Sequence, residues 1–213
     1  LGGYDPYSAS KAACEIAIES WRLSYCETKN NKVNLLRIAS ARSGNVIGGG
    51  DWSKDRIIPD AIRSLNKNSE IILRNPNSTR PWQHVLDPLL GYILLAENLY
   101  KYTQKNNGDL LNNFATSYNF GPNIESNKKV IELIDEISKH WSGLKVNKTN
   151  NNNLHEANRL NLQTDKSFHY LKWRPKWDFE NSVKRTIEWY KKIQYSEISA
   201  QKACLFDIEE YMD

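Results

Sequence analysis

Apolar residues recur at helical spacing in six stretches of the chain. In the clearest of these, 87–102, they return every three or four positions on one face, with Asp87 expected to cap the helix and Pro88 in its first turn. The stretches are separated by polar or glycine-rich segments. The pattern therefore predicts helices over 7–28, 57–65, 87–102, 128–141, 165–171 and 179–193.

Short apolar runs lie between these stretches and predict strands. The run 33–41 (VNLLRIASA) is typical of a buried parallel strand. Strands are also expected at 70–73, 118–120 and 144–148. Because strands and helices alternate, the chain is predicted to have an α/β fold with a mainly parallel sheet. The tail from Ser196 onward shows no pattern clear enough to predict an element.

A glycine-rich segment, 42–51, follows the first predicted strand and is expected to form a loop. In parallel sheets, ligands bind beyond the carboxyl ends of the strands, which is where this loop would lie. The run Gly48–Gly50 lets a backbone approach a ligand closely, so we favour a place near a ligand over a flexible turn. The segment matches neither phosphate-loop pattern, and the pyrophosphate is not assigned to it.

Composition narrows the class of protein. The chain has 213 residues, of which 39% are apolar and 11% aromatic, enough to build a core. The net charge is only +4 and the lysines are scattered, which predicts solvated faces and no nucleic-acid partner, although it suits an anionic nucleotide-sugar. No apolar run reaches the length of a membrane span, so no membrane partner is expected.

Cysteine and histidine positions predict neither disulfides nor a metal. Cys14, Cys26 and Cys204 are too few and too widely spaced for a disulfide framework, and Cys14 is expected in the core. A reducing cytoplasm fits this usage best. His84 and His155 lack metal-ligand spacing, and His84 is interpreted as a core or loop histidine.

Tyr7 and Lys11 form the most informative pair in the sequence. Residues four apart share one face of a helix, and this pair opens the predicted helix just after Pro6. A neighbouring ammonium stabilises a phenolate, which can then take a proton from a sugar hydroxyl. The same spacing also arises by chance, so the pair predicts this chemistry only in its context.

Longer motifs carry a resemblance to the extended short-chain dehydrogenase/reductase superfamily. Within it, several segments resemble the CDP-glucose 4,6-dehydratase branch, and the similarity extends to about Ile193. Trp173 and Trp177, with Pro175 between them, fit a late segment of the superfamily. The more specific segments are 42–52 (RSGNVIGGGDW), 55–60 (DRIIPD), 74–76 (RNP) and 80–85 (RPWQHV).

The resemblance implies an NAD-dependent reaction without net redox change. NAD+ accepts hydride from C4 of the glucose ring, water leaves across C5 and C6, and hydride returns to C6 to give CDP-4-keto-6-deoxyglucose. Such products serve deoxysugar biosynthesis, including that of lipopolysaccharide O-antigens. In this scheme Tyr7 is the base, and Lys11 holds the cofactor ribose and assists Tyr7. Both residues are therefore expected to be catalytic and cofactor-binding.

Three further residues are expected to bind the substrate. Asn45 resembles the family asparagine that contacts the nucleotide-sugar phosphates. Arg80 matches the superfamily arginine that pairs with the diphosphate, a role that suits a guanidinium fork. His155 lies in a His-Glu-Ala segment that resembles one near the nucleotide. The substrate implied is CDP-glucose.

The fold implied is the C-terminal part of a Rossmann-type doubly wound parallel sheet with a smaller mixed α/β substrate-binding domain. We expect part of the NAD-binding domain in 1–50, with its N-terminal half missing, and the nucleotide-sugar-binding region mainly in 51–193, some segments of which return to the first domain. Residues 194–213 are expected to form a tail. The cofactor glycines and the elimination residues are expected upstream of Leu1. The full-length protein is expected to be a homodimer.

Two other interpretations remain open. The chain can belong to another nucleotide-sugar epimerase or dehydratase of the same superfamily, which the upstream elimination residues would decide. It can also be a non-catalytic truncated remnant, an interpretation favoured by the abrupt start at Leu1.

Overall fold

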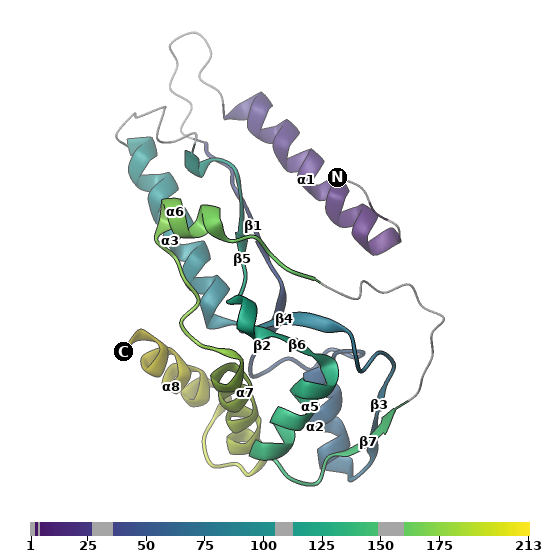
Figure 1. The fold of residues 1–213 in the computed structure, drawn as a ribbon. Helices are drawn as coiled ribbons and strands as arrows, with labels where there is room; N and C mark the ends of the chain where they lie inside the picture. Colours follow the sequence, from purple (N-terminus) through teal and green to yellow (C-terminus); the bar gives the residue numbers. More distant parts are fainter. Residues whose placement is uncertain (1–2, 4, 27–35, 105–112, 149–159) are drawn as a thin grey trace. The chain divides into compact units, whose positions relative to one another are not determined.

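The computed structural model describes residues 3, 5–26, 36–104, 113–148 and 160–213 (Figure 1). The chain divides into two compact units, which we describe separately. Unit 1 comprises 1–42, 90–119 and 164–173; unit 2 comprises 43–89, 120–163 and 174–213. Each unit therefore takes segments from distant parts of the sequence. Which unit serves the cofactor and which the substrate stays a prediction.

Unit 1 contains the helix that carries Tyr7. Its strands β1 and β5 pair in a two-stranded sheet, and the backbone N–H of Ser40 donates to the carbonyl of Thr116 at 3.2 Å. On the short helix α6, the Lys166 ammonium donates to the Ser117 carbonyl at 3.1 Å. The elements are α1 (Pro6–Tyr25), β1 (Ser40–Ser43), most of α3 (Leu86–Gln104), β5 (Ser117–Phe120) and α6 (Asp165–Leu171).

Unit 2 is built around a three-stranded sheet in the order β2-β4-β6. Strands β2 and β4 run parallel and β4 and β6 antiparallel, while β3 and β7 form a separate parallel pair. The elements are β2 (Asn45–Ile47), α2 (Ile57–Lys67), β3 (Glu70–Leu73), β4 (Thr79–His84), a 3-10 turn η1 (Ile124–Ser126), β6 (Asn127–Lys129), α5 (Val130–His140), β7 (Lys145–Lys148), α7 (Phe179–Gln194) and α8 (Ala200–Met212).

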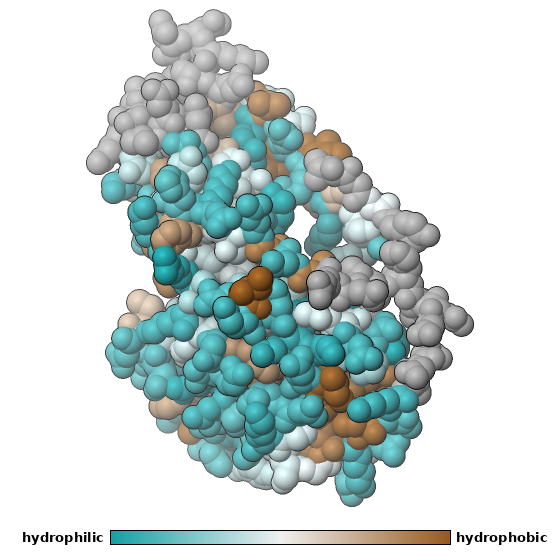
Figure 2. All heavy atoms as spheres, in the orientation of Figure 1, coloured by the Kyte–Doolittle hydropathy of each residue, from teal (hydrophilic) through white to brown (hydrophobic). Residues whose placement is uncertain are grey.

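The main core of unit 2 lies between its helices and strands. Apolar residues of α2, α5 and α7 point inward at helical spacing, as Ile62, Ile137 and Ile187 do, and each of these is 1% exposed or less. Buried strand residues such as Ile71 and Trp82 complete the cluster. The visible face of this unit is accordingly mostly hydrophilic, with apolar residues in small separate groups (Figure 2).

Most predicted elements are confirmed, but two elements and the placement of Cys14 need correction. The strand predicted over 33–41 is described only from residue 36, and only its end lies in β1. The segment 42–51 is not a single loop, because its first residues complete β1 and Asn45–Ile47 forms β2. The Ile47 side chain is buried and the backbone of β2 pairs with β4, which accounts for a strand where glycines suggested a loop. Cys14 is exposed, not in the core.

Helix α8 was not predicted, and it docks on unit 2 through buried polar contacts. It packs beside α7 (Figure 1). Its Tyr211 is 4% exposed, and the hydroxyl donates to Asp87 Oδ1 at 2.7 Å. The backbone N–H of Lys176 donates to the same oxygen at 2.7 Å. Asp87 was expected to cap its own helix. Instead, Asp87 is the second residue of α3, and its carboxylate accepts hydrogen bonds from the C-terminal part of the chain.

This contact predicts that Tyr211→Phe destabilises the protein. The change keeps the ring and removes one hydrogen bond to a buried carboxylate, which is worth about 1.5–3 kcal/mol when the acceptor is charged. Urea unfolding followed by tryptophan fluorescence measures the loss. Tyr195→Phe is the matched control, because Tyr195 is 59% exposed. Equal stability of the two variants would show that the Asp87 contact contributes nothing.

Candidate functional site

Tyr7 and Lys11 lie together on the first turns of α1. The helix begins with a capping box: the Asp5 carboxylate accepts from the Ser8 backbone N–H at 3.0 Å, and the Ser8 hydroxyl accepts from the Asp5 backbone N–H at 3.2 Å. Pro6 occupies the first helical turn, where its missing N–H costs nothing. The local sequence therefore fixes where the helix starts and presents the pair one turn later.

The pair has the geometry that the four-residue spacing predicts. The Lys11 ammonium lies 5.6 Å from the centroid of the Tyr7 ring, within the range of a cation–π contact. Tyr7 is 72% exposed, so its hydroxyl is open to solvent in the described chain. The two groups can act on one bound molecule. Their catalytic role stays a prediction.

Asn45 and Arg80 are brought to one face of the β2-β4-β6 sheet. Asn45 pairs in register with Trp82, and Arg80 precedes Trp82 by two positions on β4. Alternate residues of a strand point to the same face, so the side chains of Asn45 and Arg80 leave the sheet on the same side. Strand spacing of about 4.8 Å and a rise of about 3.3 Å per residue place their Cα atoms roughly 8 Å apart. Sequence reasoning proposed both residues but not their adjacency.

Arg80 is largely removed from water. It is 5% exposed, and its guanidinium donates to the Thr79 carbonyl at 2.9 Å. Its register partner on β6 is Lys128, a second cation on the same face. Electrostatic attraction is stronger where water is excluded. Arg80 therefore suits an anionic group such as a phosphate, whereas Lys128 also lines an acid-rich pocket.

His84, at the other end of β4, is a buried neutral side chain. It is 2% exposed, its Nδ1 accepts from the Leu86 backbone N–H at 3.4 Å, and its ring meets Trp177 edge-on at 4.7 Å. Burial, with the positive charge of Arg185 nearby, lowers the pKa of His84 to about 3. The prediction that His84 is a core histidine is confirmed by its burial.

The loop after β2 is supported by residues that sequence reasoning missed. A Cβ on Gly49 would lie 2.1 Å from Cδ2 of Trp189, so no other residue fits there without displacement of the indole. Gly50 has a φ of +87°, which favours glycine. Packing against α7 thus accounts for Gly49, and backbone conformation accounts for Gly50, without a ligand. A place near a ligand stays a prediction. From the sequence, Trp189 and Tyr190 were expected only to lie in the helix predicted over 179–193.

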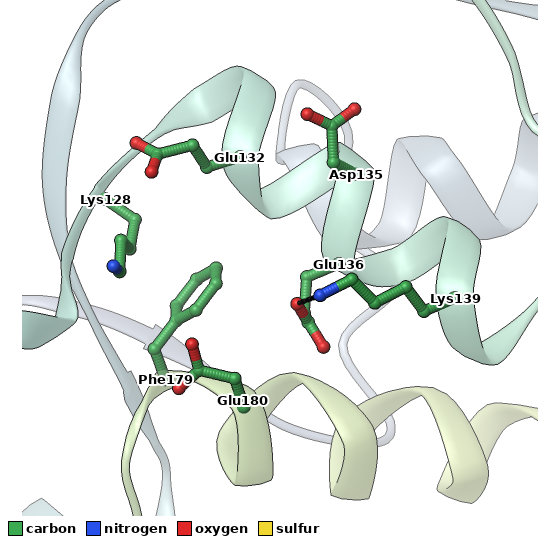
Figure 3. Close-up of a pocket in the computed structure, with 7 residues that line it drawn as sticks. All are labelled: Lys128, Glu132, Asp135, Glu136, Lys139, Phe179 and Glu180. Atoms are coloured by element: carbon green, nitrogen blue, oxygen red, sulfur yellow. Dashed lines mark hydrogen bonds and ion pairs between the residues drawn. The ribbon is translucent and has the colours of Figure 1, made fainter.

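A pocket between α5 and α7 is unsuited to a nucleotide-sugar. Carboxylates from both helices line it, and the Lys139 ammonium is already paired with Glu136 at 2.6 Å (Figure 3). Four acids face two lysines there, so a diphosphate would be repelled. The lining residues are Lys128, Glu132, Asp135, Glu136, Lys139, Phe179 and Glu180.

Clusters of metal ligands and membrane-spanning helices are both absent from the described residues. Among the described residues, no group of three or more His, Cys, Asp or Glu side chains could hold a metal ion. None of the helices in the described ranges is long and apolar enough to cross a membrane. His155 lies outside the described residues, so its expected substrate contact has no structural description.

Solved structures of nucleotide-sugar enzymes share this fold. A dTDP-glucose 4,6-dehydratase from Bacillus anthracis in complex with NAD superimposes with a TM-score of 0.68 at 20% identity, over 90% of this chain and 54% of that one. A UDP-glucuronic acid 4-epimerase from Bacillus cereus, in complex with NAD and UDP-glucuronic acid, gives 0.69 at 13% identity, over 89% and 53%. The class is thus the Rossmann-type α/β fold of nucleotide-sugar dehydratases and epimerases.

Sequence comparison identifies the family. Residues 2–186 match the GDP-mannose 4,6 dehydratase family model, and the chain belongs to this family. It is 41% identical over 192 residues to a CDP-glucose 4,6-dehydratase of Salmonella typhimurium, across 90% of this chain and 51% of that protein. It is 26% identical over 189 residues to a dTDP-glucose 4,6-dehydratase of Escherichia coli, across 87% and 47%. The chain spans about half the length of these relatives.

The buried His84 predicts a loss of stability in mild acid. Its pKa is lowered in the folded state to about 3 from 6.5, so its contribution is present above pH 6.5 and falls as the pH drops toward 3. The expected slope is up to about 1.4 kcal/mol per pH unit. His84→Phe keeps a ring against Trp177 and removes the titration, so the free energy of unfolding should depend less on pH between 6.5 and 5.

Urea unfolding at pH 7, 6 and 5 measures this difference, with His169→Phe as control because His169 is exposed. Burial raises the pKa of Asp207 to about 6, an effect of opposite sign that persists in both variants and cancels in their comparison. An unchanged pH slope in His84→Phe would refute the assignment.

Proposed function

We propose that the chain supplies the Tyr-Lys pair and the substrate-gripping region of an NAD-dependent CDP-glucose 4,6-dehydratase. The observation that carries the choice of substrate is the identity of 41% to the CDP-glucose enzyme, against 25–26% to the dTDP-glucose enzymes of human and Escherichia coli. The specific segments at 42–52 and 80–85 support the same branch. The product would be CDP-4-keto-6-deoxyglucose.

The residues present fit one part of an NAD site. Tyr7 and Lys11 lie on an exposed helical face with the ammonium beside the phenol, and both can reach a ligand. Lys11 would donate to the cofactor ribose hydroxyls. The sequence holds no G-x-G-x-x-G turn for the pyrophosphate, so that contact is not assigned to these residues. Bound NAD+ would supply reversible oxidation at C4 of the sugar.

Tyr7 would act as the general base. Its phenolate oxygen takes the proton of the C4 hydroxyl as that carbon is oxidised, and the Lys11 ammonium stabilises the phenolate before the transfer. The resulting 4-ketone acidifies the C5 proton, which permits loss of water across C5 and C6.

Asn45 and Arg80 would hold the diphosphate. Both side chains leave the same face of the sheet, so an amide and a guanidinium can bind one anionic group together. His155 is proposed as a further substrate contact, on its resemblance alone. Holding the phosphates would anchor the nucleotide-sugar on this face of the sheet. The enzyme is proposed to work in the cytoplasm.

Tyr7→Phe and Arg80→Ala should separate turnover from binding in the full-length enzyme. Loss of the Tyr7 hydroxyl should lower kcat by about 10²–10⁴-fold with KM little changed. Loss of Arg80 should mainly raise KM, because a charge-assisted contact worth roughly 1.5–3 kcal/mol disappears. The assay is formation of the 4-keto sugar from CDP-glucose.

dTDP-glucose and UDP-glucose serve as the substrate controls. Equal use of dTDP-glucose would overturn the choice of branch and favour another dehydratase of the superfamily. Near-normal turnover in Tyr7→Phe would remove Tyr7 from the mechanism. No product from any of the three sugars would favour a non-catalytic remnant.

We further propose that the full-length enzyme is a homodimer that uses α1. The helix has no buried residues in the described chain, and Ile16 and Trp21 are 56% and 58% exposed. Such exposed apolar residues favour association. Trp21→Glu should therefore shift the enzyme from dimer to monomer in light scattering at tens of micromolar. Tyr100→Glu, at a site 70% exposed on α3, is the control; a dimer in both variants would contradict the proposal.

A further inference from the structure

The loop that follows β2 is held in one conformation by α7. The Tyr190 hydroxyl donates to the Asp51 carbonyl at 2.6 Å, and Trp189 packs where Gly49 has no side chain. Burial raises the pKa of Tyr190 to about 12, so its hydroxyl keeps the donated proton at neutral pH. Gly49 and Asp51 are therefore fixed from the core side.

Polar contacts fix the next residues of the loop as well. Arg63 of α2 donates to the carbonyls of Trp52 and Ser53, at 3.1 and 3.0 Å. The Asp51 carboxylate accepts from the Ser53 backbone N–H at 2.9 Å. Asp55 has a φ of +59°, which is uncommon for a residue other than glycine. A surface loop with this many constraints is preorganised.

The Trp52 ring is what this loop presents to the outside. The side chain meets Tyr190 edge-to-face, with centroids 5.2 Å apart and planes at 82°. This contact can occupy at most one face of the indole. The residue is nonetheless 51% exposed, so a large flat apolar surface stays in water. A rigidly held, half-exposed indole is suited to stacking on another flat ring.

Cations and the strand direction point to the kind of ligand. The Arg56 side chain is 65% exposed and only 3.9 Å from the Asp51 carboxylate, a loose pair that leaves its guanidinium open to another anion. The loop lies at the carboxyl end of β2, which runs parallel to β4. Ligands of parallel sheets bind at such ends. A flat ring joined to an anion matches a nucleotide.

We propose that Trp52 binds the pyrimidine base of the nucleoside diphosphate by stacking, and that Tyr190 is the positioning residue for Trp52. This inference rests on the proposed function for the identity of the ligand. Asn45 lies on β2, three positions before Gly48, and would contact the phosphates. A single short segment would therefore bind both ends of the nucleotide. Stacking is tolerant of base identity. Trp52 would thus supply affinity, and not the choice of cytosine.

Two ligands measured by calorimetry on the full-length enzyme separate stacking from a structural effect. CDP contains the base, while inorganic pyrophosphate contains only the phosphates. Trp52→Ala should weaken CDP binding roughly tenfold and leave pyrophosphate binding unchanged. Trp52→Phe should recover most of the loss, because it restores an aromatic face. Tyr190→Phe should weaken CDP binding by a few fold through the loosened loop.

Steady-state kinetics add an independent readout. Trp52→Ala should raise KM for CDP-glucose about as much as it weakens CDP binding, with kcat unchanged. Tyr195→Ala removes another exposed aromatic ring from the same unit and should change neither constant. A merely structural role of Trp52 would instead weaken both ligands and lower kcat.

The outcomes distinguish this inference from the proposed function. Unchanged CDP affinity in Trp52→Ala would overturn the stacking, even in an active dehydratase. Equal weakening of CDP and pyrophosphate would also overturn it. A wild-type enzyme that binds CDP in a Trp52-dependent way but forms no keto sugar would support the inference and refute the proposed reaction. No CDP binding by the wild-type enzyme would overturn the stacking.

Discussion

Strand β4 is the constraint on which the rest of unit 2 depends. It pairs on both sides, in parallel with β2 and antiparallel with β6, and its residues from Arg80 to His84 are all buried. The side chains on it are tied to other parts of the unit: Trp82 donates to the Lys128 carbonyl at 3.0 Å, and Gln83 to the Phe120 carbonyl at 2.9 Å. A shift of one residue would turn each of these side chains to the opposite face. The pairing of Asn45 beside Trp82 is therefore strongly specified.

The same strand connects the candidate binding face to the C-terminus. Beyond His84, the Val85 backbone N–H donates to the Ile47 carbonyl at 2.8 Å, which extends the β2 pairing by one step. Asp87 follows within two residues and is bound by both Lys176 and Tyr211. Residues more than a hundred positions apart thus support one strand. The C-terminal helix is therefore part of the structure that supports β4 and its Arg80.

Much of this fold could be predicted from periodicity alone. The helices at α2, α3, α6 and α7 begin and end within a few residues of the predicted bounds, since each has a marked apolar stripe or a clear cap. Strand β4 could not be predicted, because Pro81 interrupts its pattern and four of its six residues are polar. Helix α8 was not predicted, because the face that it buries carries Asp207 and Tyr211. Polar residues at these positions interrupt the apolar pattern on which the prediction of helices depends.

The candidate site was predictable in its residues and not in its arrangement. Lys11 lies beside Tyr7 because residues four apart share one face of a helix, so this contact can be predicted from the local sequence alone. The adjacency of Asn45 and Arg80 depends on strand pairing across 34 intervening positions, which the sequence pattern does not contain. Gly49 illustrates a further limit, since a pattern cannot distinguish a glycine required by a ligand from one required by Trp189.

Helix α1 has a consequence for the order of unfolding events. It buries none of its residues, and polar contacts such as those of Glu15 with Ser40 and Arg42, at 2.9 and 3.2 Å, connect it to the rest of its unit. Helices gain most of their stability from packing an apolar face, and surface ion pairs add little. The amides of α1 should therefore exchange with solvent through local opening, at a lower free energy than those of α7. The helix that carries Tyr7 would then gain its full order only when its apolar face is covered.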